Sequence, residues 1–242
     1  MENRRYKIAG KIVEIHSIYH SVHRLCKDYL TEEPVDFTVE TTPMDIERER
    51  KLSISNDTPS DKAERHLSDS YLEELAVYRM IAERMPDYGT LLFHASTVAV
   101  DGWCYMFMAP SGTGKSTHTR IWREVFGDRA LMVNDDKPLV SVGDGVVVYG
   151  TPWNGKHHLG TNVSVPLKAM CLLERGIDNS ITPLPSTEAF SLLLPYMYRP
   201  AVPQGLMKAL ELLGMLASQT RLYRLACNME REAAIVAFEG MQ

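Results

Sequence analysis

The feature that most constrains this chain is the segment Ala109–Ser116, which reads A-P-S-G-T-G-K-S. It matches the phosphate-binding loop G-x-x-x-x-G-K-[ST] except at the first position, where alanine replaces glycine. Glycines let backbone N–H groups turn toward a phosphate, and the N-terminus of the following helix attracts negative charge. Because an apolar strand pattern (Trp103–Ala109) precedes the segment and a helical pattern (Lys115–Phe126) follows it, the sequence predicts a nucleotide site between a strand and a helix.

The side chains of this phosphate loop have separate predicted tasks. Lys115 is expected to reach the β- and γ-phosphate oxygens, and the Ser116 hydroxyl is expected to coordinate magnesium. The predicted cofactors are therefore ATP and Mg²⁺. A turn rich in small residues with an incidental lysine is the less favoured alternative. The predicted nucleotide-binding residues are consecutive in the chain: Ser111, Gly112, Thr113, Gly114, Lys115, Ser116 and Thr117.

Two adjacent aspartates, Asp135 and Asp136, follow a short apolar strand pattern at Ala130–Val133. A phosphoryl transferase needs a carboxylate that holds magnesium and another that takes the proton from an attacking hydroxyl. The two aspartates can divide these roles beside the phosphate loop. Because adjacent carboxylates interact, their pKa values are properties of the pair and not of either residue alone. An Asn-Asp-Asp turn between two strands is the structural alternative, which the neighbouring phosphate loop makes less favoured.

His94 lies in an apolar strand pattern, Leu91–Val100, where an imidazole is unusual. A lone strand histidine is most often a hydrogen-bonded core residue. However, the turn signal Asp101-Gly102 predicts a hairpin, which brings this strand beside the strand that feeds the phosphate loop. In that position His94 is expected to face the γ-phosphate side and to orient an aspartate.

The segment Gly150–Gly160 combines glycine turns with Trp153 and with three potentially cationic side chains, Lys156, His157 and His158. A basic loop can close over phosphates, and Lys156 would then lie against developing negative charge. A surface loop anchored by Trp153 is the alternative. A metal site at the two histidines is poorly supported, because adjacent side chains diverge and no third ligand is close in sequence.

Composition narrows the classes of partner. Lys and Arg number 26 against 31 Asp and Glu, for a net charge of −5, which does not build the basic surface of a nucleic-acid binder. The N-terminus lacks a signal-peptide pattern, and no apolar run approaches the roughly 20 residues of a membrane span. The four cysteines are far apart and contain no C-x-x-C pair. We therefore expect a cytoplasmic protein with neither a nucleic-acid nor a membrane partner.

A cluster of turn-forming residues, Asn56–Asp61, is the most linker-like stretch of the chain. It predicts a small N-terminal αβ region (residues 1–60) and a larger domain (residues 61–242). In the first region the pattern predicts a strand around Ile8–Ile12, a helix, and a second strand at Val35–Val39. In the larger domain hairpins alternate with helices, which predicts a mixed sheet.

Further elements of the larger domain are predicted from periodicity. A strand is expected at Val165–Leu173, with Pro166 marking an edge or a bulge. The tail is expected to contain the following elements: helices near Glu188–Leu194 and Leu206–Ser218, a strand at Leu222–Ala226, and a closing helix at Glu230–Glu239.

Three of these features occur in a distinctive order: Phe93–Val98 with its histidine, the loop Ser111–Ser116, and the segment Asn134–Lys137. In order and spacing they resemble the catalytic domain of bacterial HPr kinase/phosphorylase, whose phosphate loop and hairpin arrangement is similar to that of phosphoenolpyruvate carboxykinase. The resemblance covers about residues 90–176. It implies an α/β fold of the P-loop HPr kinase/phosphoenolpyruvate carboxykinase type, a mixed sheet with flanking helices.

The resemblance also implies a reaction, the ATP- and magnesium-dependent transfer of a phosphoryl group to a serine of a peptide or small protein. It implies that Asp135 is the catalytic acid/base and that Asp136 assists at the metal or in orientation. His94 matches the histidine before the family's loop, and Arg175 is implied as a phosphate or substrate clamp. The residues themselves leave two alternatives open: a kinase or phosphohydrolase acting on a small molecule, and a nucleotide-sensing module without turnover. They also leave open whether the chain forms a homo-oligomer.

Overall fold

The computed structural model describes residues 2–56, 67–155 and 158–242. Contacts divide the chain into two compact units, Met1–Glu83 and Arg84–Gln242. The boundary predicted at residues 60 and 61 lies outside the described residues. Among the described residues, no helix is both long enough and apolar enough to cross a membrane.

The N-terminal unit contains a small sheet of three strands. They lie in the order β1 (Glu2–Ile8), β2 (Lys11–Ser17) and β3 (Phe37–Glu40). The strands β1 and β2 are antiparallel, and β3 is parallel to β2. The single strand predicted around Ile8–Ile12 is wrong, because Ala9 and Gly10 have φ angles of 48° and 75° and turn the chain between two strands. The strand predicted at Val35–Val39 is confirmed as β3.

The helices of this unit follow the charge and apolar patterns of the sequence. They are α1 (His20–Leu25), the 3₁₀ turn η1 (Lys27–Tyr29), α2 (Pro43–Asn56) and α3 (Asp69–Arg84). The side chain of Glu73 in α3 is fully buried and accepts hydrogen bonds from the backbone N–H groups of Ile18 and Tyr19, at 2.6 and 2.8 Å. These bonds join α3 to the segment that follows β2.

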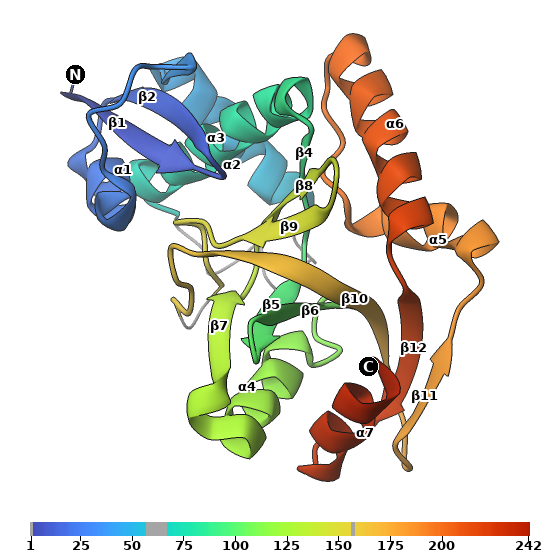
Figure 1. Cartoon of the computed structure of the whole chain (residues 1–242). Helices are drawn as coiled ribbons and strands as arrows, with labels where there is room; N and C mark the ends of the chain where they lie inside the picture. The colour runs from blue at the N-terminus through green and yellow to red at the C-terminus, as the bar shows by residue number, and fades with distance from the viewer. Residues whose placement is uncertain (1, 57–66, 156–157) are drawn as a thin grey trace. The chain divides into compact units, whose positions relative to one another are not determined.

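The second unit is built on a mixed sheet of nine strands (Figure 1). The main path runs β4-β8-β9-β10-β6-β5-β7, while β12 pairs with β10, and β11 with β12. The strands are β4 (Thr90–Leu92), β5 (Ser96–Val100), β6 (Trp103–Met108), β7 (Ala130–Asn134), β8 (Leu139–Val142), β9 (Val146–Tyr149), β10 (Ser164–Arg175), β11 (Ser180–Pro183) and β12 (Leu222–Cys227). The predicted mixed α/β sheet is thereby confirmed.

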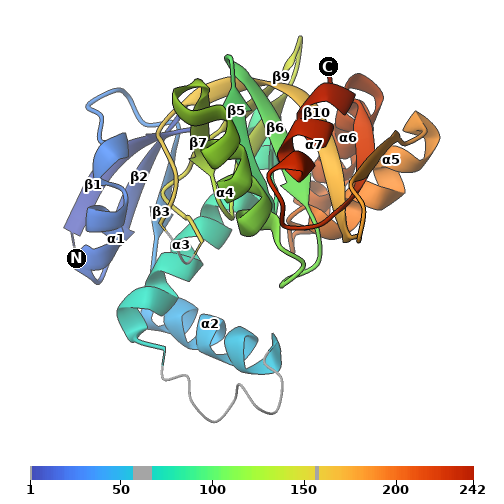
Figure 2. The same ribbon diagram turned by 90° about the horizontal axis from the view of Figure 1, so that it is seen from below.

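Helices cover the two faces of this sheet (Figures 1 and 2). The helices α4 and α7 lie on one face, while α5 and α6 lie on the other. The helical elements are η2 (Met85–Tyr88), α4 (Lys115–Phe126), η3 (Gly127–Arg129), α5 (Ser186–Leu193), η4 (Leu194–Tyr196), α6 (Pro203–Gln219) and α7 (Glu232–Gly240). The helices and the strand predicted in the tail are confirmed, with ends shifted by a few residues.

The central strand β6 contributes to both apolar cores of the unit. Successive side chains of a strand point to opposite faces, so an unbroken apolar run fits a strand covered on both sides. Alternate residues enter the core against α5 and α6: Cys104, Met106 and Met108. The intervening residues enter the core against α4 and α7: Tyr105, Phe107 and Ala109. The apolar sequence that precedes the phosphate loop is explained by this double burial.

The predicted strand Leu91–Val100 is in fact two strands, because the chain changes partners in its middle. The strand β4 pairs with β8, whereas β5 pairs with β6 and β7. Between them the N–H of Phe93 donates to Pro138 O, and the N–H of His94 donates to Tyr196 O. His94 therefore lies in the break between two strands. The rule that successive side chains of a strand point to opposite faces of the sheet does not apply to it. The hairpin predicted at Asp101-Gly102 is confirmed.

Candidate functional site

The phosphate loop joins β6 to α4 and contains two glycines with positive φ angles. Gly112 has φ 78° and Gly114 has φ 121°, and an added Cβ at either position would meet no atom within 4 Å. The glycines are therefore needed for backbone conformation and not for space. Lys115 is the first residue of α4, so the loop ends at a helix N-terminus, where unpaired N–H groups favour an anion.

Lys115 is held against the base of this loop. Its side chain is 8% exposed, and Nζ donates a hydrogen bond of 2.9 Å to Ala109 O. Burial lowers the pKa of Lys115, and the negative charges of Asp136 and Asp135 oppose that shift. At the first position of the motif, Ala109 supplies the carbonyl that accepts this bond, and its methyl group is buried in the core.

Asp135 lies at the end of β7, where it is connected to α4 through two hydroxyl groups. Its Oδ1 accepts a hydrogen bond of 2.9 Å from Ser96 Oγ, and Ser96 Oγ lies 2.8 Å from Thr119 Oγ1, one turn along α4 from Lys115. The carboxylate is 4% exposed, and Oδ2 has no hydrogen-bond partner among the described residues. A buried acceptor without a partner is unusual in a folded protein and calls for an explanation.

Asp136 is engaged through both of its oxygens. Oδ1 lies 2.8 Å from His94 Nδ1, and Oδ2 accepts a bond of 2.6 Å from Lys137 Nζ. Burial raises the pKa of Asp136, but the hydrogen bonds and charges of His94 and Lys137 outweigh it and hold the pKa at about 2. His94 was predicted to lie beside an aspartate. In the structure it contacts one, and that aspartate is Asp136.

The ion pairs of Asp136 make the free energy of unfolding depend on pH in the acidic range. The folded pKa of about 2 lies below the ordinary value of 3.8, so the stabilisation is complete above about pH 5 and is lost progressively as the pH falls toward 2. Between about pH 5 and about pH 2.5, the wild type should lose about 2 kcal/mol more free energy of unfolding than Asp136→Asn. Urea unfolding in the presence of a chelator measures this difference. Equal losses in both proteins would contradict this expectation. The matched control is Asp144→Asn, which makes the same change at an exposed hairpin aspartate.

Asn134 fixes the shape of the turn that carries the acid pair. The residue is fully buried, and its Oδ1 accepts hydrogen bonds from the N–H groups of Asp136 (2.8 Å) and Lys137 (2.6 Å). Its Nδ2 lies 3.0 Å from both Thr151 Oγ1 and Asn154 Oδ1. Asn134 was not among the predicted site residues. The tendency of asparagine to bond the backbone two residues on was the available signal.

The loop after β9 reaches the acid pair at Gly155. A Cβ added to Gly155 would lie 3.2 Å from Asp135 Oδ2, so the backbone passes directly beside the unpartnered oxygen. Trp153 is buried, as the anchored-loop alternative expected. The predicted phosphate contact Lys156 lies outside the described residues, as does His157.

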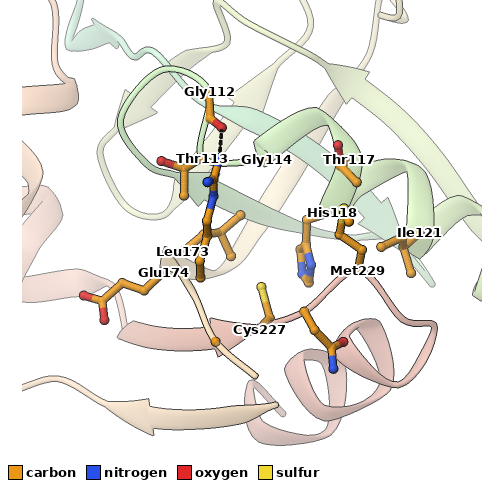
Figure 3. Close-up of a pocket in the computed structure, with 13 residues that line it drawn as sticks. Gly112, Thr113, Gly114, Thr117, His118, Ile121, Leu173, Glu174, Cys227 and Met229 are labelled. Carbon is orange, nitrogen blue, oxygen red and sulfur yellow. Dashed lines mark hydrogen bonds between the residues drawn. The ribbon is translucent and has the colours of Figure 1, made fainter. Parts of the chain in front are cut away.

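Arg175 lies at the C-terminal end of β10. Because β10 runs parallel to β6, its end reaches the same edge of the sheet as the phosphate loop. The exposed Arg175 guanidinium donates a hydrogen bond of 2.8 Å from Nη2 to Gly112 O (Figure 3). The predicted clamp residue therefore contacts the backbone of the loop at Gly112, and its role toward phosphate or substrate stays a prediction.

Two other polar residues that were not predicted belong to this region. Ser96 and His118 are buried, and they lie on β5 and α4. Ser96 stands in the same short segment as His94, but nothing local in the sequence indicates its bond to Asp135. For His118 a signal exists, since Trp122 follows it at the four-residue spacing that places two side chains on one helix face.

A family model described as "SynChlorMet cassette protein ScmC" matches residues 64–235 of this chain. The chain belongs to the ScmC family. In this ScmC protein the phosphate loop, the acid pair, His94, His118 and Arg175 all lie inside the matched range. Among curated proteins none matches the chain.

One solved structure similar to this ScmC chain is described as the HPr(Ser) kinase/phosphatase from Coxiella burnetii. The two sequences are 10% identical, the TM-score is 0.34, and the alignment covers 62% of this chain and 95% of the other. The function implied by the motif resemblance therefore stays a prediction that rests on the residues of this chain.

Proposed function

We propose that this protein is an ATP- and magnesium-dependent kinase that transfers the γ-phosphoryl group to a hydroxyl, with serine of a peptide or small protein as the acceptor. The observation that carries the proposal is the Asp135 carboxylate, which is buried beside the phosphate-loop helix with Oδ2 unpartnered in the described part of the chain. An unsatisfied buried polar group costs about 1–3 kcal/mol. Nucleotide binding alone requires no such oxygen, whereas a proton acceptor for an attacking hydroxyl does.

The nucleotide phosphates would be bound by the loop and by the first turn of α4. The N–H groups from Ser111 to Thr117 and the Lys115 ammonium supply donors and positive charge. The Lys115 ammonium is already oriented by its bond to Ala109 O and can turn from that carbonyl to a phosphate oxygen. Lys156 and Arg175 are proposed as further contacts to phosphate or substrate.

The residues at this edge of the sheet fit a magnesium ion bound together with the nucleotide. Ser116 offers a hydroxyl, and the acid pair offers carboxylate oxygens, which are the hard donors that Mg²⁺ prefers. Asp136 is proposed as the metal carboxylate, since each carboxylate oxygen has a second lone pair beyond its bond to His94 or Lys137. The ion would neutralise charge on the phosphates, and it would be held by Ser116 and Asp136.

The proposed proton acceptor is Asp135 Oδ2. In the transfer the acceptor oxygen forms a bond to the γ-phosphorus, the bond between that phosphorus and the bridging oxygen breaks, and ADP leaves. The hydroxyl proton passes to Asp135. The bond from Ser96 Oγ to Oδ1 fixes the carboxylate and leaves Oδ2 unpartnered among the described residues, so Oδ2 is the oxygen that would take the proton. Asp136 remains ionised at neutral pH because its pKa is about 2, and it contributes fixed negative charge that orients His94 and Lys137.

Incubation with γ-labelled ATP and Mg²⁺ tests this function, with a pool of serine-containing peptides and a pool of small hydroxyl metabolites as acceptors. Label in phosphoserine is the expected result. Label only in metabolites, or only in inorganic phosphate, would instead indicate a small-molecule kinase or a phosphohydrolase. Tight ATP binding with no product after long incubation would indicate a nucleotide-sensing module and would overturn the proposal.

A further inference from the structure

A pocket of about 510 Å³ adjoins the phosphate loop (Figure 3). Its walls are the loop itself, the first two turns of α4, the end of β10 and the segment that follows β12. The residues that line it do not include His94, Asp135 or Asp136, so the pocket is separate from the proposed proton acceptor. Its size is within the range of pockets that bind a nucleoside or a molecule of similar size.

His118 presents a polar ring to this pocket. Figure 3 shows the ring pointing from α4 toward Cys227, with Met229 and Ile121 beside it. The side chain is 3% exposed. Its Nδ1 is buried and has no hydrogen-bond partner within the described ranges. Polar groups elsewhere in the lining are supplied by Thr113, Thr117, Glu174, Arg175 and Asn228. The side chains drawn nearest to the ring, Ile121, Cys227 and Met229, are carbon and sulfur groups that do not pair with this nitrogen.

The proton on the His118 ring can be assigned from its other nitrogen. The indole Nε1–H of Trp122 donates a hydrogen bond of 2.9 Å to His118 Nε2. An indole nitrogen only donates, so Nε2 must be unprotonated, and the ring proton is on Nδ1. Burial also lowers the pKa of His118 to about 3, which keeps the ring neutral. The pocket therefore contains a fixed N–H donor to which no described residue offers an acceptor.

We propose that this pocket receives the nucleoside of the nucleotide whose phosphates the loop binds, and that His118 Nδ1–H donates a hydrogen bond to an acceptor atom of a purine base. Purine rings present nitrogen acceptors on their edges, and their faces suit apolar walls. The exposed Met229 at the mouth has a flexible thioether that adapts to a flat ring. Gly112–Gly114 form both the loop and one wall of the pocket, which gives a continuous path from phosphate to base.

A base fits this pocket better than the phosphoryl acceptor does. The acceptor hydroxyl must approach Asp135 Oδ2, and Asp135 is not part of the pocket wall. The inference rests on the nucleotide binding in the proposed function, and it does not depend on phosphoryl transfer.

The test compares ATP with inorganic tripolyphosphate, which has phosphates but no nucleoside, by titration calorimetry. His118→Phe keeps an aromatic ring and removes the donor, so it should weaken ATP binding about five- to tenfold and leave tripolyphosphate binding within about twofold. Lys115→Met is the matched comparison and should weaken both ligands. An equal effect of His118→Phe on both ligands, or none on ATP, would overturn the assignment of the pocket.

A second measurement decides the question even where His118→Phe fails to fold. In the wild-type protein the ¹⁵N and ¹H signals of His118 Nδ1–H should shift with ATP and not with tripolyphosphate; the opposite pattern would refute the contact. Failure of the wild type to bind either ligand would overturn both this inference and the proposed function. ATP binding that depends on His118, without any phosphoryl transfer, would overturn the kinase proposal alone.

Discussion

Asp135→Asn should lower the rate of phosphoryl transfer by about 10²–10⁴-fold, the contribution typical of a positioned proton acceptor. The affinity for ATP should change by less than about threefold, since the amide keeps the size of the carboxylate and can still accept the bond from Ser96. An asparagine oxygen does not take up a proton, so the attacking hydroxyl loses its base. Single-turnover transfer with labelled ATP and calorimetric ATP binding measure the two quantities.

The control for this experiment is Asp144→Asn, which makes the same chemical change on an exposed hairpin and should leave transfer unchanged. Asp136→Asn is a second comparison, because it removes the other carboxylate of the pair and its contacts with His94 and Lys137. Wild-type transfer by Asp135→Asn would show that another group accepts the proton. Loss of ATP binding in parallel with loss of transfer would show that Asp135 supports the nucleotide site and not the chemistry.

Asn134→Ala should lower the free energy of unfolding by about 3 kcal/mol and also abolish transfer. The truncation removes the acceptor for the N–H groups of Asp136 and Lys137, and it leaves Thr151 and Asn154 without their bonds to Nδ2. The turn that orients the acid pair then loses its internal support. Urea unfolding and the transfer assay measure the two effects.

Asn154→Ala provides a graded control for the same network. Asn154 contributes one bond from Asn134 Nδ2 and one of its own to Pro152 O, at 3.0 and 3.3 Å. We expect its substitution to cost about 1–2 kcal/mol, since each of the two hydrogen bonds contributes roughly 0.5–1.5 kcal/mol. Equal destabilisation by the two substitutions would contradict the view that Asn134 is the centre of the network.

Local patterns in the sequence predicted most of the second unit. The apolar run of β6, the helical period of α4 and the glycines between them indicated the strand, loop and helix that the structure contains. The helices and the strand of the tail were also found from periodicity. In these elements the backbone conformation follows from neighbouring residues, so short-range information is sufficient.

One error occurred where strand partners are distant in the chain, and the other at a local turn. The run Leu91–Val100 has the composition of one strand, but its two halves pair with β8 on one side and with β6 and β7 on the other. In the N-terminal unit, alternation around Ile8–Ile12 concealed the turn at Ala9 and Gly10. Strand pairing is decided by register across the sheet, which periodicity along one segment does not contain.

The sequence by itself determined a glycine-containing segment between a strand and a helix, an acid pair after a short strand, and a helix in which His118 stands four residues before Trp122. Only the tertiary structure decided which polar atoms of these groups are occupied. Ser96 reaches Asp135 across 39 residues of sequence and leaves Oδ2 without a hydrogen-bond partner in the described part of the chain, while His94 and Lys137 bind Asp136. Such contacts depend on which strands lie side by side, and hydrogen bonds are made or missed within a fraction of an ångström. The chemistry of the residues is therefore local, and the assignment of their roles comes from the packing of the sheet.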